Sequence, residues 1–154
     1  MEQDFWIRHA EEKDLDTLTQ FNIELAKETE GKELSLKSIS SGIQAILKNA
    51  EYGFYLVLEK NRKVVGCLMI TTEWSDWRNG FFWWIQSVYV PPDFRRQGIF
   101  KALYQRIQTM AKDHPNVCGL RLYVDRENHK AQETYHRMGM EETNYVLYEE
   151  EFRR

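Results

Sequence analysis

The segment from residue 82 to residue 124 constrains the fold more than any other part of the chain. An apolar run ends at Val90, Pro91-Pro92 follows, a helical stripe covers residues 98–113, and a second apolar run, VCGLRLYV, follows. Proline cannot donate to a strand ladder, so the first strand ends before the proline pair. A strand, a helix and a strand in this order form a right-handed parallel crossover. The segment therefore predicts two parallel strands joined by one helix.

The rest of the chain supplies the neighbours of this crossover. Alternation over residues 4–9 predicts a short strand, and two apolar stripes at helical spacing follow, with Asp14 and Ser35 as candidate N-caps. Two apolar runs around Lys60-Asn61-Arg62-Lys63 predict a hairpin. NHKAQETYHRMG predicts a helix and ETNYVLYEEEF a last strand or strands, so the order is β-α-α-β-β-β-α-β-α-β. We expect an α/β (α+β) domain with a mixed, mostly antiparallel twisted sheet of about six to seven strands and about four helices.

Length and charge narrow the class of protein. The chain has 154 residues and no internal linker or repeat, which favours a single domain over residues 1–154. Its net charge of -3 gives no basic field for nucleic acid. The N-terminus has no apolar signal region, and no apolar run approaches the ~20 residues that span a bilayer. Cys67 and Cys118 lie in apolar runs, which is typical of buried thiols in a reducing compartment. We expect a soluble, cytoplasmic protein without nucleic-acid or membrane partners.

The start of the predicted helix over 98–113 carries an unusual set of side chains. Arg95, Arg96 and Gly98 stand directly before the apolar stripe. A helix N-terminus presents unpaired N–H groups and partial positive charge, glycine allows close approach to the backbone, and arginine suits phosphate. The Walker A and dinucleotide glycine patterns are both absent. The segment therefore predicts a pyrophosphate site for another kind of ligand. The four histidines show no ligand spacing, so no metal is expected.

The pattern Arg-x-x-Gly-x-x after the strand SVYV resembles motif A of the GNAT N-acetyltransferase superfamily. IQSVYV is similar to the central strand of that family, and RENHKAQETYHRMGMEE is similar to its next motif. The order of elements agrees over the whole chain. Within the family, ITTEWSDWRNGFFWWIQSVYV resembles the spermidine/spermine and thialysine acetyltransferase branch.

This resemblance implies a site for acetyl-CoA, used as a cosubstrate. Its pantetheine arm would pair with the backbone of Val88, Tyr89 and Val90. Its pyrophosphate would be held by a set of amides and cationic side chains, which are Arg95, Arg96, Gln97, Gly98, Ile99, Phe100 and Lys101. Phe100 departs from the family, which has a small residue at this position. It either alters the site or packs on the inner face of the helix.

Two residues of the second motif have a functional and a structural interpretation. Asn128 resembles the asparagine that hydrogen-bonds the pantetheine arm, and it also suits a helix N-cap. Tyr135 follows two helical turns later on the same face. In the family the matching tyrosine protonates the leaving thiolate as a general acid. The alternative is a buried aromatic side chain with a satisfied hydroxyl.

The general base and the acceptor site are the least defined parts. Gln86 stands where the branch has an acidic residue, and glutamine cannot take a proton. Glu73 could act through a water molecule, or be a solvated carboxylate at a strand end. Trp74 and Trp77, in a predicted connector, could wall an acceptor pocket together with Trp84, Gln86 and Glu28, and a tryptophan face attracts an ammonium group. Core packing and a solvated helix face are the alternatives.

The resemblance implies an N-acetyltransferase that moves an acetyl group from acetyl-CoA to a primary amine by direct attack in a ternary complex. A small amine or an amino acid is the expected acceptor. A protein or peptide acetyltransferase and a CoA-binding module without transfer activity remain alternatives. The apolar segment NYVLYEEEF could pair across a homodimer, as in many relatives.

Overall fold

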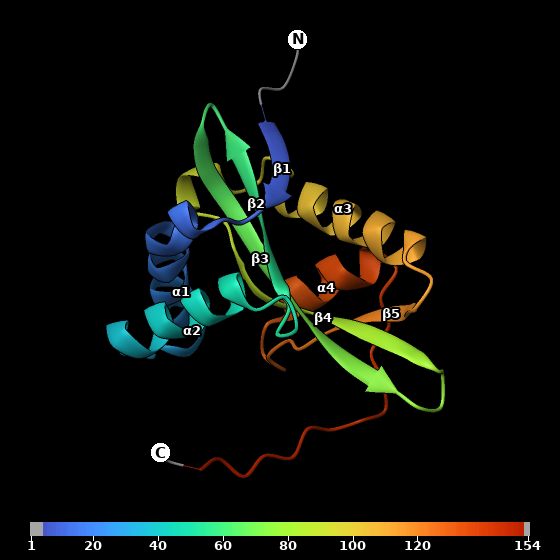
Figure 1. The fold of residues 1–154 in the computed structure, drawn as a ribbon. Helices are drawn as coiled ribbons and strands as arrows, with labels where there is room; N and C mark the ends of the chain where they lie inside the picture. Colours follow the sequence, from blue (N-terminus) through green and yellow to red (C-terminus); the bar gives the residue numbers. More distant parts are fainter. Residues whose placement is uncertain (1–4, 153–154) are drawn as a thin grey trace. The chain divides into compact units, whose positions relative to one another are not determined.

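The computed structural model describes residues 5–152, and the chain divides into two compact units (Figure 1). The first unit ends at Leu122 and the second begins at Tyr123. The single domain over residues 1–154 stays a prediction. Asp4, the first residue of the predicted N-terminal strand, lies outside the described residues.

The first unit contains a five-stranded sheet in the order β1-β2-β3-β4-β5. Its strands are β1 (Phe5–His9), β2 (Phe54–Lys60), β3 (Lys63–Ser75), β4 (Gly80–Tyr89) and β5 (Val117–Leu122). The first four pair antiparallel with their neighbours, and β5 pairs parallel with β4. The helix α3 (Ile99–Asp113) joins β4 to β5. The mixed, mostly antiparallel sheet and its parallel crossover are therefore confirmed.

Two further helices, α1 (Leu15–Glu30) and α2 (Leu36–Lys48), precede β2 in the chain. Gly31 ends α1 because it adopts φ 60°, a left-handed conformation that glycine tolerates. Ser35 caps α2 as predicted, its side chain accepting a hydrogen bond from the Ser38 N–H. Asp14 does not cap α1 with its side chain.

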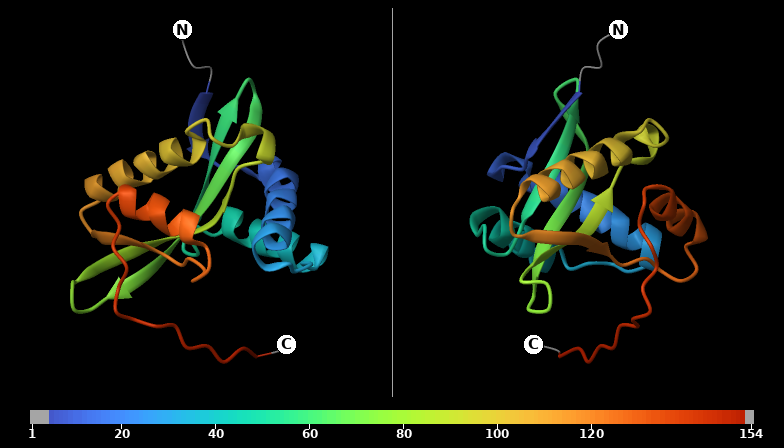
Figure 2. Two further views of the ribbon diagram at one scale, coloured as in Figure 1. Left: turned by 180° about the vertical axis from the view of Figure 1, so that it is seen from behind. Right: turned by 90° about the vertical axis from the view of Figure 1, so that its right-hand side faces the viewer.

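The helices pack on opposite faces of the sheet, α1 and α2 on one and α3 on the other (Figures 1 and 2). Successive strand residues alternate between the two faces. Tyr55, Val57 and Cys67 belong to the core cluster formed with α1 and α2. On the other face α3 lies so close that a Cβ atom at Gly66 would come within 2.6 Å of the Ile99 side chain. β3 therefore contributes to the packing on both faces of the sheet.

The tryptophan-rich stretch was predicted to be a connector, and this was wrong. β3 continues to Ser75 and β4 begins at Gly80, so only a tight turn separates them. Trp74 lies within β3, opposite Phe81, and the two rings pack edge to face. Asn79 adopts φ 51° in this turn, and Asn61 adopts φ 52° in the predicted β2–β3 turn. Cross-strand aromatic pairs stabilise the β3–β4 ladder in a stretch whose polar composition had predicted a loop.

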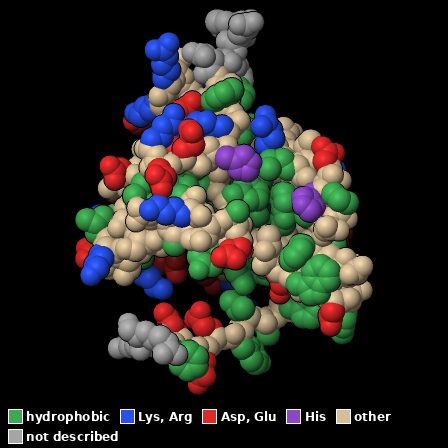
Figure 3. All heavy atoms as spheres, in the orientation of Figure 1, with side chains coloured by type: hydrophobic (Ala, Val, Ile, Leu, Met, Phe, Trp, Pro, Cys, Tyr) green, Lys and Arg blue, Asp and Glu red, His purple; other side chains and the backbone are tan. Residues whose placement is uncertain are grey.

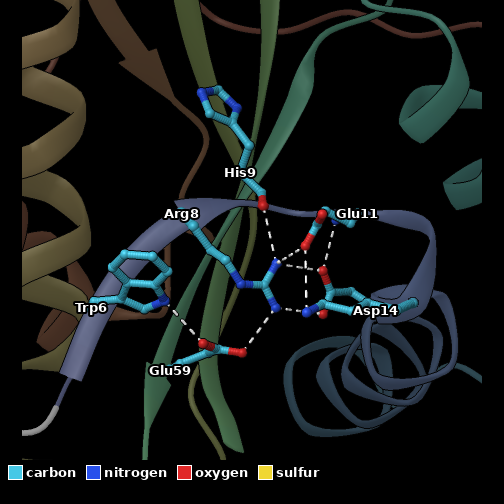
Figure 4. Close-up of polar contacts among 7 residues, drawn as sticks. Trp6, Arg8, His9, Glu11, Asp14 and Glu59 are labelled. Carbon is cyan, nitrogen blue, oxygen red and sulfur yellow. Dashed lines mark hydrogen bonds and ion pairs between the residues drawn. The ribbon is translucent and has the colours of Figure 1, made fainter. Parts of the chain in front are cut away.

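A network of charges ties β1 and β2 to the start of α1 (Figure 4). The Arg8 guanidinium contacts Asp14 at 2.8 and 2.9 Å and Glu59 at 3.0 Å. Asp14 also accepts a hydrogen bond from the Glu11 N–H. Burial alone would raise the pKa of Asp14, but these hydrogen bonds and the charge of Arg8 outweigh it and hold that pKa below its ordinary value.

The second unit contains the helix α4 (His129–Arg137) and an extended C-terminal segment. Within residues 123–152 the structure contains no strand, so the predicted last strand and the count of six to seven strands were wrong. Tyr145, Val146, Leu147 and Tyr148 are all exposed, and hydrophobic and acidic side chains are visible along this segment (Figure 3). Strand propensity alone does not make a strand, because backbone N–H and C=O groups need a partner edge.

Candidate active site

A β-bulge interrupts β4 near its end. Met69 pairs with Gln86 and Cys67 pairs with Tyr89, so two residues of β4, Ser87 and Val88, stand opposite one residue of β3. Ser87 adopts φ 51°, which is uncommon for a residue other than glycine. Such conformations persist where the surrounding structure enforces them, and they cluster at functional sites. The bulge therefore marks the end of β4 as a candidate site.

The same part of β4 has an open edge on the side of β5. The parallel ladder ends at the pair Ile85–Leu122, and no further β4–β5 pair forms within the described residues. The backbone from Gln86 to Val90 can therefore accept an extended ligand by strand addition on that side. Val88, Tyr89 and Val90, which the resemblance assigned to the pantetheine arm, lie along this edge.

A short turn leads from this edge to the start of α3. The 3₁₀ helix η2 (Pro92–Phe94) follows β4, and Gly98 then occupies the N-cap of α3 with φ 78°. No side chain caps this helix, and its first turn contains no acidic residue. A Cβ atom at Gly98 would meet nothing within 4 Å, so the position is open to a ligand. The amides at the start of α3 thus form a site suited to an anion.

The two arginines before Gly98 lie in different surroundings. Arg95 donates to the Val90 carbonyl at 2.7 Å and pairs with Glu28 of α1 at 2.6 Å. Arg96 is exposed, and its side chain makes no hydrogen bond or ion pair with another of the described residues 5–152. Arg95 therefore braces the turn against α1, whereas Arg96 leaves its charge available to a ligand. Lys101 is also exposed, in the first turn of α3.

Gln97 and Phe100 complete the predicted set around Gly98. The Gln97 side chain accepts a hydrogen bond from Lys60 at 3.0 Å and donates one to the Asp93 carbonyl at 3.4 Å. The Phe100 ring is partly buried and packs against Tyr104, with ring centroids 6.1 Å apart. This contact supports the interpretation of Phe100 as a packing residue of α3.

A cavity of about 300 Å³ opens between α1, α2 and the sheet. Its helical lining consists of Asn22 from α1 and Ile39, Gly42, Ile43 and Ile46 from α2. The other lining residues are Tyr52, Tyr55, Met69, Thr71 and Ser87. Ser87 therefore connects this cavity to the bulge of β4. The volume lies at the lower end of the range of small-molecule sites, roughly 300–1,000 Å³.

A hydrogen-bonded group of neutral side chains forms one wall of the cavity. The Tyr55 hydroxyl accepts a hydrogen bond from Asn22 at 3.1 Å and is also hydrogen-bonded by the Ser87 side chain. Burial raises the pKa of Tyr55 to about 12, so its hydroxyl stays protonated at neutral pH. Gln86 donates to the Thr71 hydroxyl beside it. The polar atoms of this wall are therefore uncharged.

Glu73 and Trp84 belong to a separate cluster farther along the sheet. The Glu73 carboxylate accepts hydrogen bonds from Arg121 at 2.8 Å and from the Trp84 indole at 3.2 Å. The Arg121 guanidinium lies over the Phe82 ring, 3.6 Å from its centroid. Neither Glu73 nor Trp84 lines the cavity. The role of Glu73 as a base stays a prediction.

The other predicted acceptor residues do not line the cavity either. Trp77 is 86% exposed in the β3–β4 turn and Trp74 is 52% exposed, and hydrophobic side chains are visible over the tip of this hairpin (Figure 3). Glu28 binds Arg95 and the Tyr89 hydroxyl. Gln86 contacts the lining residue Thr71 without being part of the lining.

Asn128 and Tyr135 belong to the second unit. The Asn128 side chain accepts a hydrogen bond from the Ala131 N–H at 3.1 Å, which confirms it as the N-cap of α4. Only its carbonyl oxygen serves the cap, so its amide N–H groups can donate elsewhere. Burial raises the pKa of Tyr135 above its ordinary value.

Sequence reasoning missed the cavity and the residues Asn22, Tyr55 and Thr71. Two signals were present: a glycine inside the predicted second helix, and an asparagine within the apolar stripe of the first. Within residues 5–152 no group of three or more His, Cys, Asp or Glu side chains could hold a metal ion. No described helix is both long and apolar enough to cross a membrane.

Several solved structures are similar to this chain in overall fold. The crystal structure of a possible acetyltransferase from Clostridium difficile 630 has 46% sequence identity and a TM-score of 0.92, covering 99% of this chain and 100% of that one. A predicted acetyltransferase from Clostridium acetobutylicum, solved with acetyl-CoA, has 20% identity and a TM-score of 0.78, over 95% of this chain and 96% of that one. An aminoglycoside acetyltransferase from an uncultured soil sample, in complex with sisomicin, has 17% identity and a TM-score of 0.78 over 97% of both chains. At 20% and 17% identity, the similarity to these last two proteins concerns the fold alone.

Sequence comparisons give the family. A protein of Methanocaldococcus jannaschii described as an uncharacterized N-acetyltransferase is 35% identical over 102 residues, which is 66% of this chain. The match spans 44% of that relative, less than half of its length. The spermidine/spermine and thialysine branch stays a prediction. The sequence model of the acetyltransferase (GNAT) family matches residues 16–140, and the chain therefore belongs to this family.

Proposed function

We propose that this protein is an N-acetyltransferase that transfers the acetyl group of acetyl-CoA to a primary amine. One observation carries the proposal: an open strand edge at Val88–Val90 leads directly to an uncapped helix N-terminus at Gly98. The first feature suits an extended amide-containing arm and the second suits a pyrophosphate, in the order in which CoA contains them. Arg96 and Lys101 supply exposed positive charge beside the pyrophosphate.

The reaction is a direct attack within a ternary complex. The neutral amine nitrogen forms a bond to the thioester carbonyl carbon, and the carbon–sulfur bond then breaks. Backbone N–H groups at the bulge of β4 are candidates to stabilise the developing oxyanion, since Ser87 turns the backbone out of the regular ladder. The acetylated amine loses one proton, and the CoA thiolate gains one.

Tyr135 is the proposed donor of the proton to the thiolate. Its burial raises its pKa, so the hydroxyl is protonated at neutral pH and available to a general acid. We expect Tyr135→Phe to lower kcat by roughly 10- to 1,000-fold. The usual contribution of a general acid or base is about 100- to 10,000-fold, so this range overlaps its lower part. Steady-state kinetics at saturating acetyl-CoA measures this effect. A normal kcat in this variant would remove Tyr135 from the chemistry.

Glu73 is the proposed acceptor of the amine proton, acting through a water molecule. Its contacts with Arg121 and Trp84 both use Oε1, so Oε2 can bind water. Glu73→Gln should then lower kcat/KM most at low pH, where the amine is most protonated. The same loss at every pH would assign Glu73 to positioning only.

The acceptor is proposed to be a small amine or an amino acid, and the size of the cavity beside Ser87, about 300 Å³, supports a small molecule. The test is incubation with acetyl-CoA and a panel of polyamines, amino acids, alkylamines and peptides, with release of CoA measured by mass spectrometry. Amine-dependent release supports the function. Thermal stabilisation by CoA without turnover on any amine would indicate a CoA-binding module instead.

We also propose a homodimer in a reducing compartment such as the cytoplasm. The exposed apolar side chains of residues 145–148 would gain a buried environment by pairing with a second copy. Both cysteines are free, which agrees with a reducing compartment. Sedimentation of the chain against a variant that ends at Thr143 tests the dimer, since the shortened chain should sediment as a monomer.

A further inference from the structure

We infer that the cavity between α1, α2 and the sheet selects an acceptor with a compact, uncharged, apolar body. This inference rests on the proposed function and goes beyond it, because it assigns the chemical class of the acceptor. It also disfavours a polycationic amine such as spermidine as the acceptor. Four observations carry it: the lining, the position of the acidic residues, the glycine in α2 and the connection to Ser87.

The lining is apolar over most of its area. Ile39, Ile43 and Ile46 lie on one stripe of α2, because residues three and four apart share a helix face. Met69 of β3 lies on the sheet side, and methionine adapts its shape to ligands. The polar atoms come from the amide of Asn22 and from hydroxyl groups. No Asp, Glu, Lys or Arg belongs to the lining within the described residues.

Three acidic residues of α1 are engaged outside the cavity. Glu28 pairs with Arg95, Glu30 pairs with Lys32, and Glu24 accepts a hydrogen bond from Gln20. A cationic chain entering the cavity would lose its hydration without meeting a carboxylate, which is costly. An alkyl or phenyl body has no charge to desolvate on entry and gains about 25 cal/mol per Å² of buried apolar surface.

Gly42 keeps one side of the cavity open. It lies within α2, where glycine costs about 1 kcal/mol relative to alanine, and it has no positive φ that would require glycine. A Cβ atom at this position would meet nothing within 4 Å. Neither backbone conformation nor close packing explains the glycine. Gly42 is exposed and also lines the cavity, so a larger side chain here would occupy the opening through which a ligand enters.

Ser87 orients the acceptor. It lines the cavity and also belongs to the bulge of β4, beside the open edge proposed to hold the pantetheine arm. An amine whose body lies against α2 would therefore present its nitrogen near Ser87 and Thr71. Apolar surroundings disfavour the ammonium form and lower the pKa of the bound amine. The cavity would thus help to supply a neutral nucleophile, although Gln86 cannot act as a base.

The test compares isopentylamine and 2-phenylethylamine with spermidine on the full chain. Binding is measured by calorimetry in the presence of CoA, which requires no turnover, and kcat/KM is measured with acetyl-CoA. We expect the apolar amines to bind at least tenfold more tightly than spermidine and to have the higher kcat/KM. Equal or tighter binding of spermidine, or no binding of either apolar amine, would overturn the inference.

The variant Gly42→Leu places a side chain in the cavity, and Gln44→Leu places the same side chain on the exposed face of α2. We expect Gly42→Leu to weaken binding of isopentylamine at least tenfold and to leave the Kd of CoA unchanged. Gln44→Leu should change neither. If Gly42→Leu fails to fold, Gly42→Val replaces it.

Unchanged isopentylamine binding in a folded cavity variant would mean that the acceptor binds elsewhere, while the chain could still acetylate amines. A different result would be that Gly42→Leu abolishes isopentylamine binding while the wild-type chain turns over no amine. That result would contradict the proposed function but support the assignment of the cavity as a binding site.

Discussion

The two faces of the sheet are built from the same strands but packed differently. On the α3 face the chain is tightly filled, and Leu103 and Ile107 are fully buried. The α1–α2 face contains a cavity and three buried polar residues, Asp14, Thr19 and Asn22. Dense packing stabilises a fold, whereas space and polar groups serve binding. The α3 face is therefore filled, whereas the α1–α2 face combines a buried core with space for a ligand.

The largest expected effect comes from the same substitution on each face. Ile107→Ala removes a side chain that is 0% exposed from the filled face, and Ile43→Ala removes one that is 3% exposed beside the cavity. We expect losses of about 4 kcal/mol and about 2 kcal/mol in the free energy of unfolding, because isoleucine-to-alanine changes cost ~2–5 kcal/mol and least where contacts are already missing. Urea denaturation measures both. Equal losses would break the comparison.

The next effect concerns the ion pair at the margin of the ligand-binding face. Asp14→Asn leaves Arg8 with a weakened partner, and we expect a loss of about 2 kcal/mol, less than the ~3–5 kcal/mol for a fully buried charge because Arg8 is partly exposed. The depressed pKa of Asp14 makes its contribution complete above its unfolded pKa of about 3.9. That contribution disappears as pH falls through the lower, folded pKa.

Unfolding measured from pH 7 down to pH 2 checks this dependence. The wild type should lose stability through the acidic limb more steeply than Asp14→Asn. Parallel curves would show that Asp14 is not the titrating group. Glu11→Gln is the matched control. Glu11 is exposed, and its nearest carboxylate oxygen lies 3.5 Å from Arg8, compared with 2.8 Å for Asp14.

A smaller effect separates the two adjacent arginines. Arg96→Ala should raise the KM for acetyl-CoA about tenfold, equal to ~1.4 kcal/mol, without changing stability. Arg95→Ala should also lower the melting temperature, because it removes the bond to Val90 and the pair with Glu28. Kinetics and thermal unfolding of the two variants measure these effects. A stability loss in Arg96→Ala alone would reverse the assignment.

The smallest effect tests whether the cavity costs stability. Gly42→Ala should raise the free energy of unfolding by up to about 1 kcal/mol, because alanine favours a helix over glycine and meets no steric barrier here. Thermal unfolding against Ser41→Ala, on the neighbouring exposed position, isolates the contribution of the glycine. A destabilised Gly42→Ala would show that the space is already filled by neighbours in solution.

The elements that sequence predicts well are those with local causes. Pro91 ends β4, the Asn61 turn sets the hairpin, and Ser35 and Asn128 cap their helices. The start of α3 at Gly98 was also predictable, because the glycine directly precedes the apolar helical stripe. Each of these features depends on a few successive residues.

The features that sequence missed depend on contacts between distant residues. The bulge at Ser87 is defined by pairing with β3, and the Arg95–Glu28 pair joins residues 67 positions apart. The cavity requires α1, α2 and two strands together. Cys118 was predicted to be buried, and this was wrong because it lies exposed on β5, the last strand of the sheet. The C-terminal segment had strand composition but no partner.

The unequal exposure of the two cysteines has a practical consequence. Burial raises the pKa of Cys67 to about 12, so its thiol will not react with alkylating reagents in the folded protein. Cys118 is exposed and open to such reagents. A maleimide dye would therefore label each chain at one position on β5. The same thiol would also consume a colorimetric disulfide reagent, so Cys118→Ser is the appropriate background for any spectrophotometric measurement of released CoA.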